Sequence, residues 1–112
     1  MSKPWQPYAR HIVDTIAKIR RISARGNLLA DEVLYDATLR NLQTLSEATH
    51  HFPDELRALY PDIPWKQISG FRNILVHSYL GEIGAQTAQG VVDRYLPPLE
   101  IAITALLGQV PR

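Results

Sequence analysis

Apolar residues recur along the chain with the period of an α-helix, and no segment alternates long enough to predict a β-strand. Stretches with Gly or Pro at 26–27, 53, 61–64, 81–84 and 97–98 divide the pattern. At about 100° per residue, the first segment has one apolar face, made of Tyr8, Ile12, Thr15, Ile16, Ile19 and Ile22. The opposite edge carries Arg10, Asp14, Lys18, Arg21 and Arg25.

A second helix is predicted from about Asp31, a suitable N-cap, to about His50. Arg40 and Glu47 lie on its flank, and Asn41 falls in the middle of its inner face. A buried amide without partners costs about 1–3 kcal/mol, so we expect Asn41 to be a satisfied core residue that fixes helix register. The other residues expected on that face are Leu34, Ala37, Leu45 and Ala48.

The remaining sequence predicts one short helix and two long ones. The short helix opens at residues 53–55 and ends near Tyr60, and a helix that starts after Pro64 is predicted to run from 65 to 79, with Gly81 as its stop. Apolar residues from 85 to 110 keep one helical phase across Pro97 and Pro98, which predicts one long helix kinked there. We therefore expect an all-α single domain over residues 1–112, an antiparallel bundle of four long helices and one short helix.

Size and composition agree with one small globular domain. The chain has 112 residues, of which 46% are hydrophobic and 21% charged. It contains no cysteine, which excludes disulfides, thiolate zinc sites and cysteine nucleophiles. No apolar run reaches the roughly 20 residues that span a bilayer, and the first residues lack the core of a signal peptide. We expect a soluble, cytoplasmic protein without membrane contact.

The small net charge of +1 hides an asymmetry. Residues 1–25 hold six basic residues and one acidic residue, a net charge of +5, whereas the other 87 residues hold six basic and ten acidic residues, a net charge of −4. One basic end suits a phosphate-bearing partner. A solvated helix face explains the pattern equally well, and the spacing of Arg10, Asp14 and Lys18 allows an ion-pair ladder.

The predicted helix over 65–79 carries an unusual combination of polar side chains. On a helical wheel one arc is apolar, and it holds Ile68, Phe71, Ile74 and Leu75. Away from that arc lie Val76 and the polar residues Arg72, Asn73, His77 and Tyr79. An Arg fork and an Asn amide can bind phosphate oxygens, and His transfers protons near neutral pH. Two structural explanations remain open, namely that Arg72 pairs with a carboxylate such as Glu47, and that His77 caps carbonyls near the helix end.

The segment 72–79, RNILVHSY, resembles the R-N-x-L-x-H-x-Y signature of HepT-like toxins in the HEPN superfamily. The resemblance extends over roughly residues 8–107, because four other segments share the family's order and spacing: 36–42, 46–48, 60–65 and 96–99. The chain departs from the family pattern after Tyr79, where the stretch 80–90 is one residue longer than expected and has Gln89 in place of the usual Trp.

The resemblance implies an all-α homodimer that acts as a metal-independent endoribonuclease toxin with no cofactor. It implies catalytic roles for Arg72 and His77, with Asn73 as the polar residue that follows the arginine. Tyr79 would be the residue to which the antitoxin, an MntA-like minimal nucleotidyltransferase, adds AMP. We expect Arg10, Lys18, Arg21 and Arg25 to bind the RNA substrate, and Arg40, Asn41 and Glu47 to be supporting polar residues.

The chemistry of RNA cleavage gives a reason to expect a dimer. RNA supplies its own nucleophile, the 2′-OH, so cleavage without a metal needs a base, an acid and a cation at the phosphorane. One His77 cannot readily be both base and acid in one step, and a two-fold dimer supplies two copies.

Other interpretations stay open at this stage. The chain could be a non-catalytic helical module that binds RNA or a nucleotide for a separately encoded nucleotidyltransferase. It could also be a structural dimerisation domain, although that leaves the polar arc around Arg72 unexplained. Glu47, His50 and His51 have a spacing that a metal site could use, but we expect solvated surface there and no metal.

Overall fold

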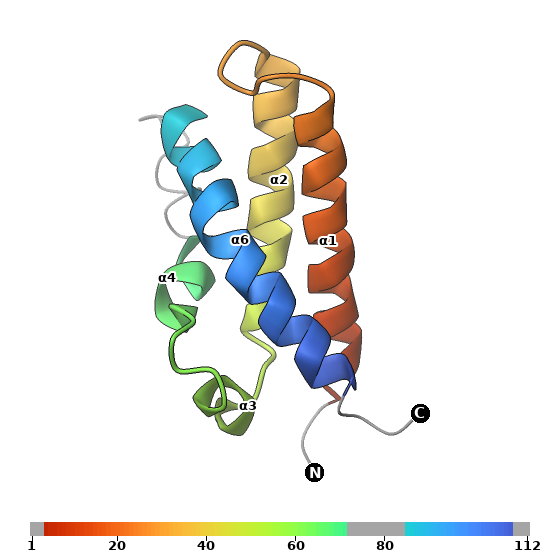
Figure 1. Ribbon diagram of the computed structural model, residues 1–112, viewed down its shortest axis with the longest axis vertical. Coiled ribbons are helices and arrows are strands. Elements are labelled where there is room, and N and C mark those ends of the chain that lie inside the picture. The colour runs from red at the N-terminus through yellow and green to blue at the C-terminus, as the bar shows by residue number, and fades with distance from the viewer. Residues whose placement is uncertain (1–3, 72–84, 109–112) are drawn as a thin grey trace.

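The structure is a computed structural model, and it describes residues 4–71 and 85–108. Within these ranges every regular element is an α-helix, which confirms the all-α class. The helices are α1 (Gln6–Ala24), α2 (Glu32–Thr49), α3 (Asp54–Ala58), α4 (Trp65–Ser69) and α6 (Ala85–Gly108). Figure 1 shows α1 and α2 side by side and antiparallel, with α6 packed across them and α4 on the opposite flank from α1.

Two helix ends follow local sequence signals. Pro7 stands in the first turn of α1, where a missing N–H costs nothing. Asp31 is the N-cap of α2, and its Oδ1 accepts hydrogen bonds from the backbone N–H groups of Val33 at 2.9 Å and Leu34 at 3.3 Å. The predicted cap is therefore confirmed, and α2 ends within one residue of the predicted end.

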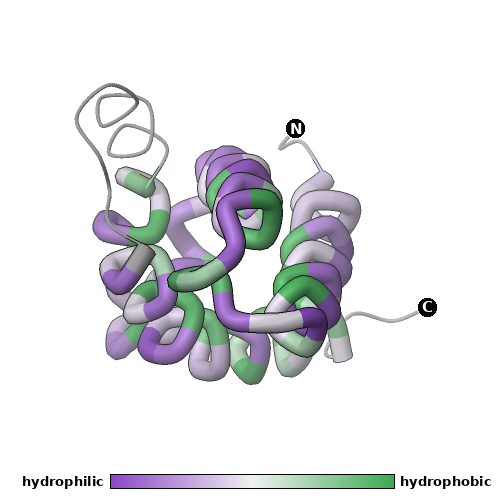
Figure 2. Tube along the Cα trace, turned by 90° about the horizontal axis from the view of Figure 1, so that it is seen from above, coloured by the Kyte–Doolittle hydropathy of each residue, from purple (hydrophilic) through white to green (hydrophobic). Residues whose placement is uncertain are grey.

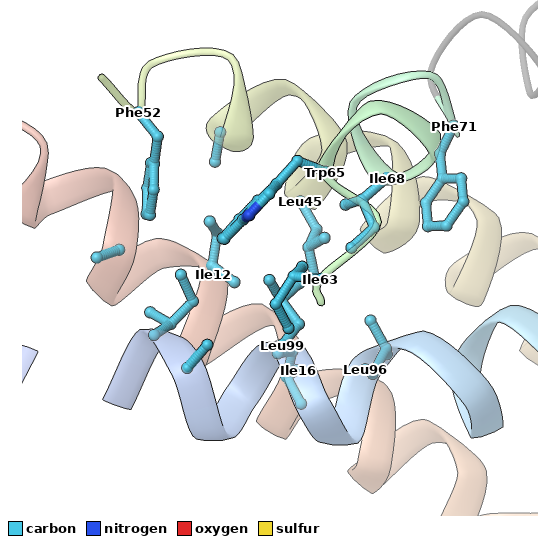
Figure 3. Packing of buried hydrophobic residues seen from close by; sticks show 14 of the residues in the cluster. Ile12, Ile16, Leu45, Phe52, Ile63, Trp65, Ile68, Phe71, Leu96 and Leu99 are labelled. Carbon is cyan, nitrogen blue, oxygen red and sulfur yellow. The ribbon is translucent and has the colours of Figure 1, made fainter. Parts of the chain in front are cut away.

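The main core lies where α1, α2, α4 and α6 meet (Figure 3). Trp65 is buried there, and its Nε1–H donates to the carbonyl oxygens of Tyr60 at 3.0 Å and Arg57 at 3.1 Å. Trp65 therefore packs in the core with its N–H group satisfied. The fully buried aliphatic side chains of the cluster are Ile12, Ile16, Ile19, Leu42, Leu45, Ile68, Leu99, Ile103 and Leu106.

The buried face of α2 differs from the predicted one. Ala37 and Asn41 are half-buried, whereas Thr38 and Leu42 lie in the core. Thr38 tolerates full burial because its hydroxyl donates to the Leu34 carbonyl oxygen at 2.8 Å, one turn back on the same helix. The predicted face did not include Thr38 or Leu42, and it was therefore displaced toward Ala37 and Asn41.

The predicted single helix from residue 65 to residue 79 is also wrong, because α4 ends at Ser69. Gly70 follows it as the C-cap, and glycine is a poor helix former. A Cβ at this position would lie 3.2 Å from the Lys66 carbonyl oxygen, so the turn is tight as well as weak. Phe71 is again helical, and the predicted stop at Gly81 lies outside the described residues.

The prediction for the last helix is confirmed as one element, because α6 continues through Pro97 and Pro98. Each proline removes a backbone N–H and so leaves the carbonyl four residues earlier without its usual donor. These prolines and the residues that carry those carbonyls, Asp93 and Arg94, are all exposed, so water can replace the missing donors. The buried Leu96 and Leu99 beside them hold the helix against the core.

Candidate functional site

The residues of the predicted motif, Arg72, Asn73, His77 and Tyr79, lie outside the described residues. The structure describes the chain up to Phe71, directly before Arg72, and from Ala85 onward. It therefore defines how the chain directly before the motif is held. It also places the predicted RNA-binding and supporting residues.

Polar side chains of α2 fix the last residue of α4. The Ser69 carbonyl oxygen accepts hydrogen bonds from the Ser46 Oγ at 3.0 Å and from the His50 Nε2 at 2.9 Å. The Ser69 hydroxyl lies 2.9 Å from the hydroxyl of Thr49, which donates to the Ser46 carbonyl oxygen at 2.6 Å. Ser46 and Thr49 are fully buried. We call Ser46, Thr49, His50 and Ser69 the polar seam, and it holds the chain three residues before Arg72.

Apolar packing also holds the end of α4 and Phe71 against the rest of the protein. Ile68 is fully buried, and Phe71 is buried against α6, where its ring centroid lies 5.7 Å from that of Tyr95. Phe71 and Tyr95 also line an open groove of about 610 Å³, together with Lys66, Gln67, Gly70 and Val91. The chain thus enters the motif beside a groove between α4 and α6.

The basic residues predicted to bind RNA lie on one exposed face of α1. Arg10, Lys18, Arg21 and Arg25 fall within an arc of about 80° on the helix, and all four are exposed. Asp14 lies within the same arc, so the face has a net charge of +3. We call this set of four basic residues and Asp14 the basic stripe.

The ion-pair ladder considered for this stripe does not form. Among the described residues, the ion pairs are Arg20–Glu100 at 2.7 Å and Arg57–Asp54 at 3.1 Å, and neither uses a residue of the basic stripe. Arg20 lies outside the stripe and joins α1 to α6. The four stripe cations therefore keep their charges available to a partner.

The basic stripe and Phe71, the last described residue before the motif, lie on different sides of the molecule. The stripe points away from the buried face of α1 that contains Ile12 and Ile16. Two views at right angles place α1 and α4 on opposite flanks (Figures 1 and 2). Within one chain, the stripe is thus remote from Phe71, and an RNA that touches both must pass around the bundle or belong to an assembly.

The predicted supporting residues do not form one group. Asn41 is half-buried, and its Nδ2 donates to the Ala37 carbonyl oxygen at 2.7 Å, so its amide is satisfied within α2. Arg40 and Glu47 are exposed and share an outer arc of the same helix, about 100° or more from Asn41. Asn41 is therefore separated from the other two.

The neighbouring histidines at the end of α2 have different partners. His50 belongs to the polar seam, whereas the ring of His51 stacks on Tyr8 of α1, with centroids 4.0 Å apart and an angle of 8° between the planes. Among the described residues, no group of three or more His, Cys, Asp or Glu side chains is arranged to hold a metal ion. Within the same ranges, no helix is long and apolar enough to cross a membrane.

Sequence reasoning did not find the polar seam or the Tyr8–His51 stack. Both join residues that are distant in the chain, so no local spacing predicts them. The positions of Ser46, Thr49 and His50, three or four residues apart, place them on one side of α2, and this was the available signal.

Comparison with known proteins identifies relatives along nearly the whole chain. The family described as ribonuclease HepT-like matches residues 10–106. The chain is 30% identical over 106 residues to "Putative RNase TTE0752" of Caldanaerobacter subterraneus subsp. tengcongensis, and the match covers 91% of this chain and 93% of that protein. It is 27% identical over 84 residues to "Probable ribonuclease HepT" of Thermococcus cleftensis, covering 72% and 76% of the two chains.

A third relative has a different overall size. "Gamma-glutamylcyclotransferase and putative RNase MJ0434" of Methanocaldococcus jannaschii is 27% identical over 115 residues, and the match covers all of this chain but 51% of that protein. No solved structure matches the chain.

Proposed function

Because the chain belongs to the ribonuclease HepT-like family, we propose that it is a metal-independent endoribonuclease and the toxin of a toxin–antitoxin pair. The observation that carries this proposal is the family match over residues 10–106, a range that contains the whole Arg72–Tyr79 motif. The names of the relatives from Caldanaerobacter and Thermococcus support a ribonuclease. We further propose that the protein cleaves inside RNA chains, with the mechanism and the partners described below.

In the proposed reaction the RNA supplies the nucleophile. A base removes the proton of a 2′-OH, whose oxygen attacks the adjacent phosphorus, while an acid protonates the departing 5′-oxygen. The products carry a 2′,3′-cyclic phosphate and a 5′-OH. His77 fits the roles of base and acid when two copies meet in a homodimer, and Arg72, with Asn73, fits the stabilisation of the non-bridging oxygens.

The described part of the protein supports this proposal in two ways. The polar seam and the buried Ile68 and Phe71 fix the backbone directly before Arg72, and such preorganisation is what charge stabilisation in a transition state requires. The basic stripe leaves four cations available to phosphate groups. A homodimer would allow the stripe of one subunit to approach the motif of the other.

The test of catalysis is cleavage of RNA by the purified protein in the presence of a chelator. His77→Ala should abolish cleavage, and Arg72→Ala should remove most of it, because the lost cation contributes several kcal/mol to the transition state. Arg94→Ala, an exposed change on α6, is the charge control and should cleave normally. Wild-type protein that binds RNA but leaves it intact would favour the non-catalytic binding module, and loss of activity with the chelator would contradict metal independence.

The regulatory half of the proposal concerns Tyr79. AMP attached to its hydroxyl would place an anionic phosphate and a nucleoside beside Arg72, so modified protein should bind and cut RNA poorly. Tyr79→Phe should keep its nuclease activity and escape neutralisation by an MntA-like nucleotidyltransferase. Intact-mass measurement after co-expression tests this, and an unchanged mass in a neutralised complex would contradict modification.

The oligomeric state is tested separately by light scattering. The proposal expects the mass of a homodimer for the active protein. A monomer that still cleaves RNA would contradict the shared site.

A further inference from the structure

An open groove separates the beginning of α1 from the end of α2, away from the turn that leads into the motif. Its volume is about 540 Å³, and it is lined by residues of both helices: Pro7, Tyr8, His11, Thr44, Glu47, Ala48 and His51. Hydroxyl, carboxylate and imidazole groups thus surround a largely apolar floor. No role in the proposed cleavage accounts for this groove.

The Tyr8–His51 stack forms one wall of the groove. Tyr8 is half-buried and packs against the main core, whereas His51 is exposed, so Tyr8 is the inner ring and His51 the outer ring. The two rings are nearly parallel, at 8°, and their centroids lie 4.0 Å apart. Because Tyr8 fixes the plane of the imidazole, His51 offers a preoriented flat surface to a further ring.

The groove adjoins the basic stripe. His11 lines the groove. Arg10 of the stripe directly precedes His11 in the chain, and Lys18 of the stripe follows it seven residues later on α1. Lys18 lies about 10 Å along the helix from His11 at 1.5 Å per residue. A flat ring surface beside a row of cations is the combination that binds single-stranded nucleic acid, because bases stack on rings while phosphates contact Lys and Arg.

We propose that this groove is a subsite for one nucleobase of a single-stranded RNA, which stacks on His51 while the basic stripe holds the neighbouring phosphates. This inference rests on the proposed function, because it takes the RNA substrate from there. The proposed occupant is RNA because the basic stripe, which starts at Arg10 beside the groove, carries a net charge of +3, or +2 when Glu47 of the groove is counted. This charge complements a polyanion and would repel the same face of a second copy.

The test is binding of a fluorescein-labelled single-stranded RNA of about ten nucleotides, measured by anisotropy in the His77→Ala background so that the RNA stays intact. His51→Ala should weaken binding by about 5- to 150-fold, the range expected when one base loses a stacking partner. His51→Phe keeps a flat ring and should restore most of the affinity. Arg94→Ala, outside the groove and the stripe, is the matched control for an unrelated surface change.

A second ligand separates stacking from charge. An abasic oligomer with the same ribose-phosphate backbone should bind the parent and His51→Ala equally, and Lys18→Ala should weaken its binding at low salt. Equal RNA affinity of His51→Ala and the parent would overturn the inference, as would an equal loss for the abasic oligomer. A changed molecular mass of His51→Ala in light scattering would also overturn it, because the groove would then be an interface between copies.

The outcomes for the subsite and for catalysis can be told apart. If wild-type protein cleaves RNA and His51→Ala binds RNA as the parent does, the proposed function stands and the subsite fails. If wild-type protein cleaves no RNA while binding still depends on the ring at position 51, the subsite stands and the nuclease proposal fails.

Discussion

His50 and His51 are neighbours in the chain, yet they belong to two surfaces of α2 with opposite properties. On the α4 side, His50 joins the polar seam, in which Ser46 and Thr49 are fully buried and their hydroxyls are bonded. On the α1 side, His51 stacks on Tyr8 at the edge of an open groove. Buried polar groups must find partners inside the protein, so the seam fixes structure, whereas the groove presents the exposed ring of His51.

This contrast gives a simple expectation. Changes on the α4 side should lower the free energy of unfolding and, through it, the order of the chain before Arg72. Changes on the α1 side should lower the free energy of unfolding less and act mainly on RNA binding. Four substitutions test this difference, and their expected effects on stability decrease in the order Ile68→Ala, Thr49→Val, His51→Ala and Arg21→Ala.

Ile68→Ala should have the largest effect, because Ile68 is the fully buried side chain that docks α4 on the core. Truncation of a buried Ile leaves a cavity and costs about 2–5 kcal/mol. Urea denaturation measures the loss, and the exposed neighbour Gln67→Ala is the matched control, with a change within about 0.5 kcal/mol. Equal stability of the two variants would mean that α4 is not anchored through Ile68.

Thr49→Val should have the next largest effect. Valine keeps the shape of threonine but removes the hydroxyl that bonds the Ser46 carbonyl oxygen and lies 2.9 Å from the Ser69 hydroxyl. Leaving buried polar groups without partners costs about 1–3 kcal/mol. Thr49→Ser keeps the hydroxyl and should lose about 0.8 kcal/mol for its missing methyl group.

The same pair of variants sharpens the link to catalysis. If the proposed nuclease activity is present, Thr49→Val should lower kcat more than it changes KM, and Thr49→Ser should recover most of kcat. Normal kcat in Thr49→Val under conditions where it is folded would show that the seam stabilises α4 without positioning the motif.

His51→Ala should have a smaller effect on stability than Thr49→Val. The ring is exposed, and a stacked pair of this kind contributes about 0.5–1.5 kcal/mol. The free energy of unfolding from urea titration gives the comparison directly. A loss larger than that of Thr49→Val would contradict the division into a structural α4 side and an open α1 side.

Arg21→Ala should have the smallest effect on stability, within about 0.5 kcal/mol, because Arg21 is exposed and makes no ion pair with another described residue. It should instead reduce the dependence of log Kd for RNA on log salt by about 0.7, the value for one phosphate contact on a single strand. Anisotropy titrations at several salt concentrations measure this slope, and Arg94→Ala should leave it unchanged. An unchanged slope in Arg21→Ala would remove this residue from the RNA-binding surface.

Local signals in the sequence were enough for the ends and faces of several helices. Asp31 predicted the start of α2, and the structure shows its carboxylate bonded to the first backbone N–H groups. The apolar phase across Pro97 and Pro98 predicted one continuous helix, which α6 confirms. These features depend on residues within two or three turns of each other, so the sequence carries them directly.

Predictions failed where a longer-range contact or a single residue changed the local preference. Periodicity favoured one helix from 65 to 79, but Gly70 ends α4, where Lys66 leaves little room for a Cβ. Thr38 is buried because its hydroxyl is satisfied by α2 itself, and a simple polar–apolar pattern cannot show that. For the candidate site, the motif residues themselves lie outside the described ranges, and the sequence remains their basis.

The sequence by itself determined the all-α class, most helix ends, the basic character of α1 and the motif that marks the family, because each of these depends on residue type and short spacing. Tertiary structure decided that Ser46, Thr49 and His50 meet Ser69, and that Tyr8 meets His51. The partners in these contacts lie 19 to 43 positions apart in the chain. Their contacts exist because burial of the Ile and Leu side chains between α1, α2, α4 and α6 fixes how the helices pack, and no local pattern encodes which polar groups that packing brings together.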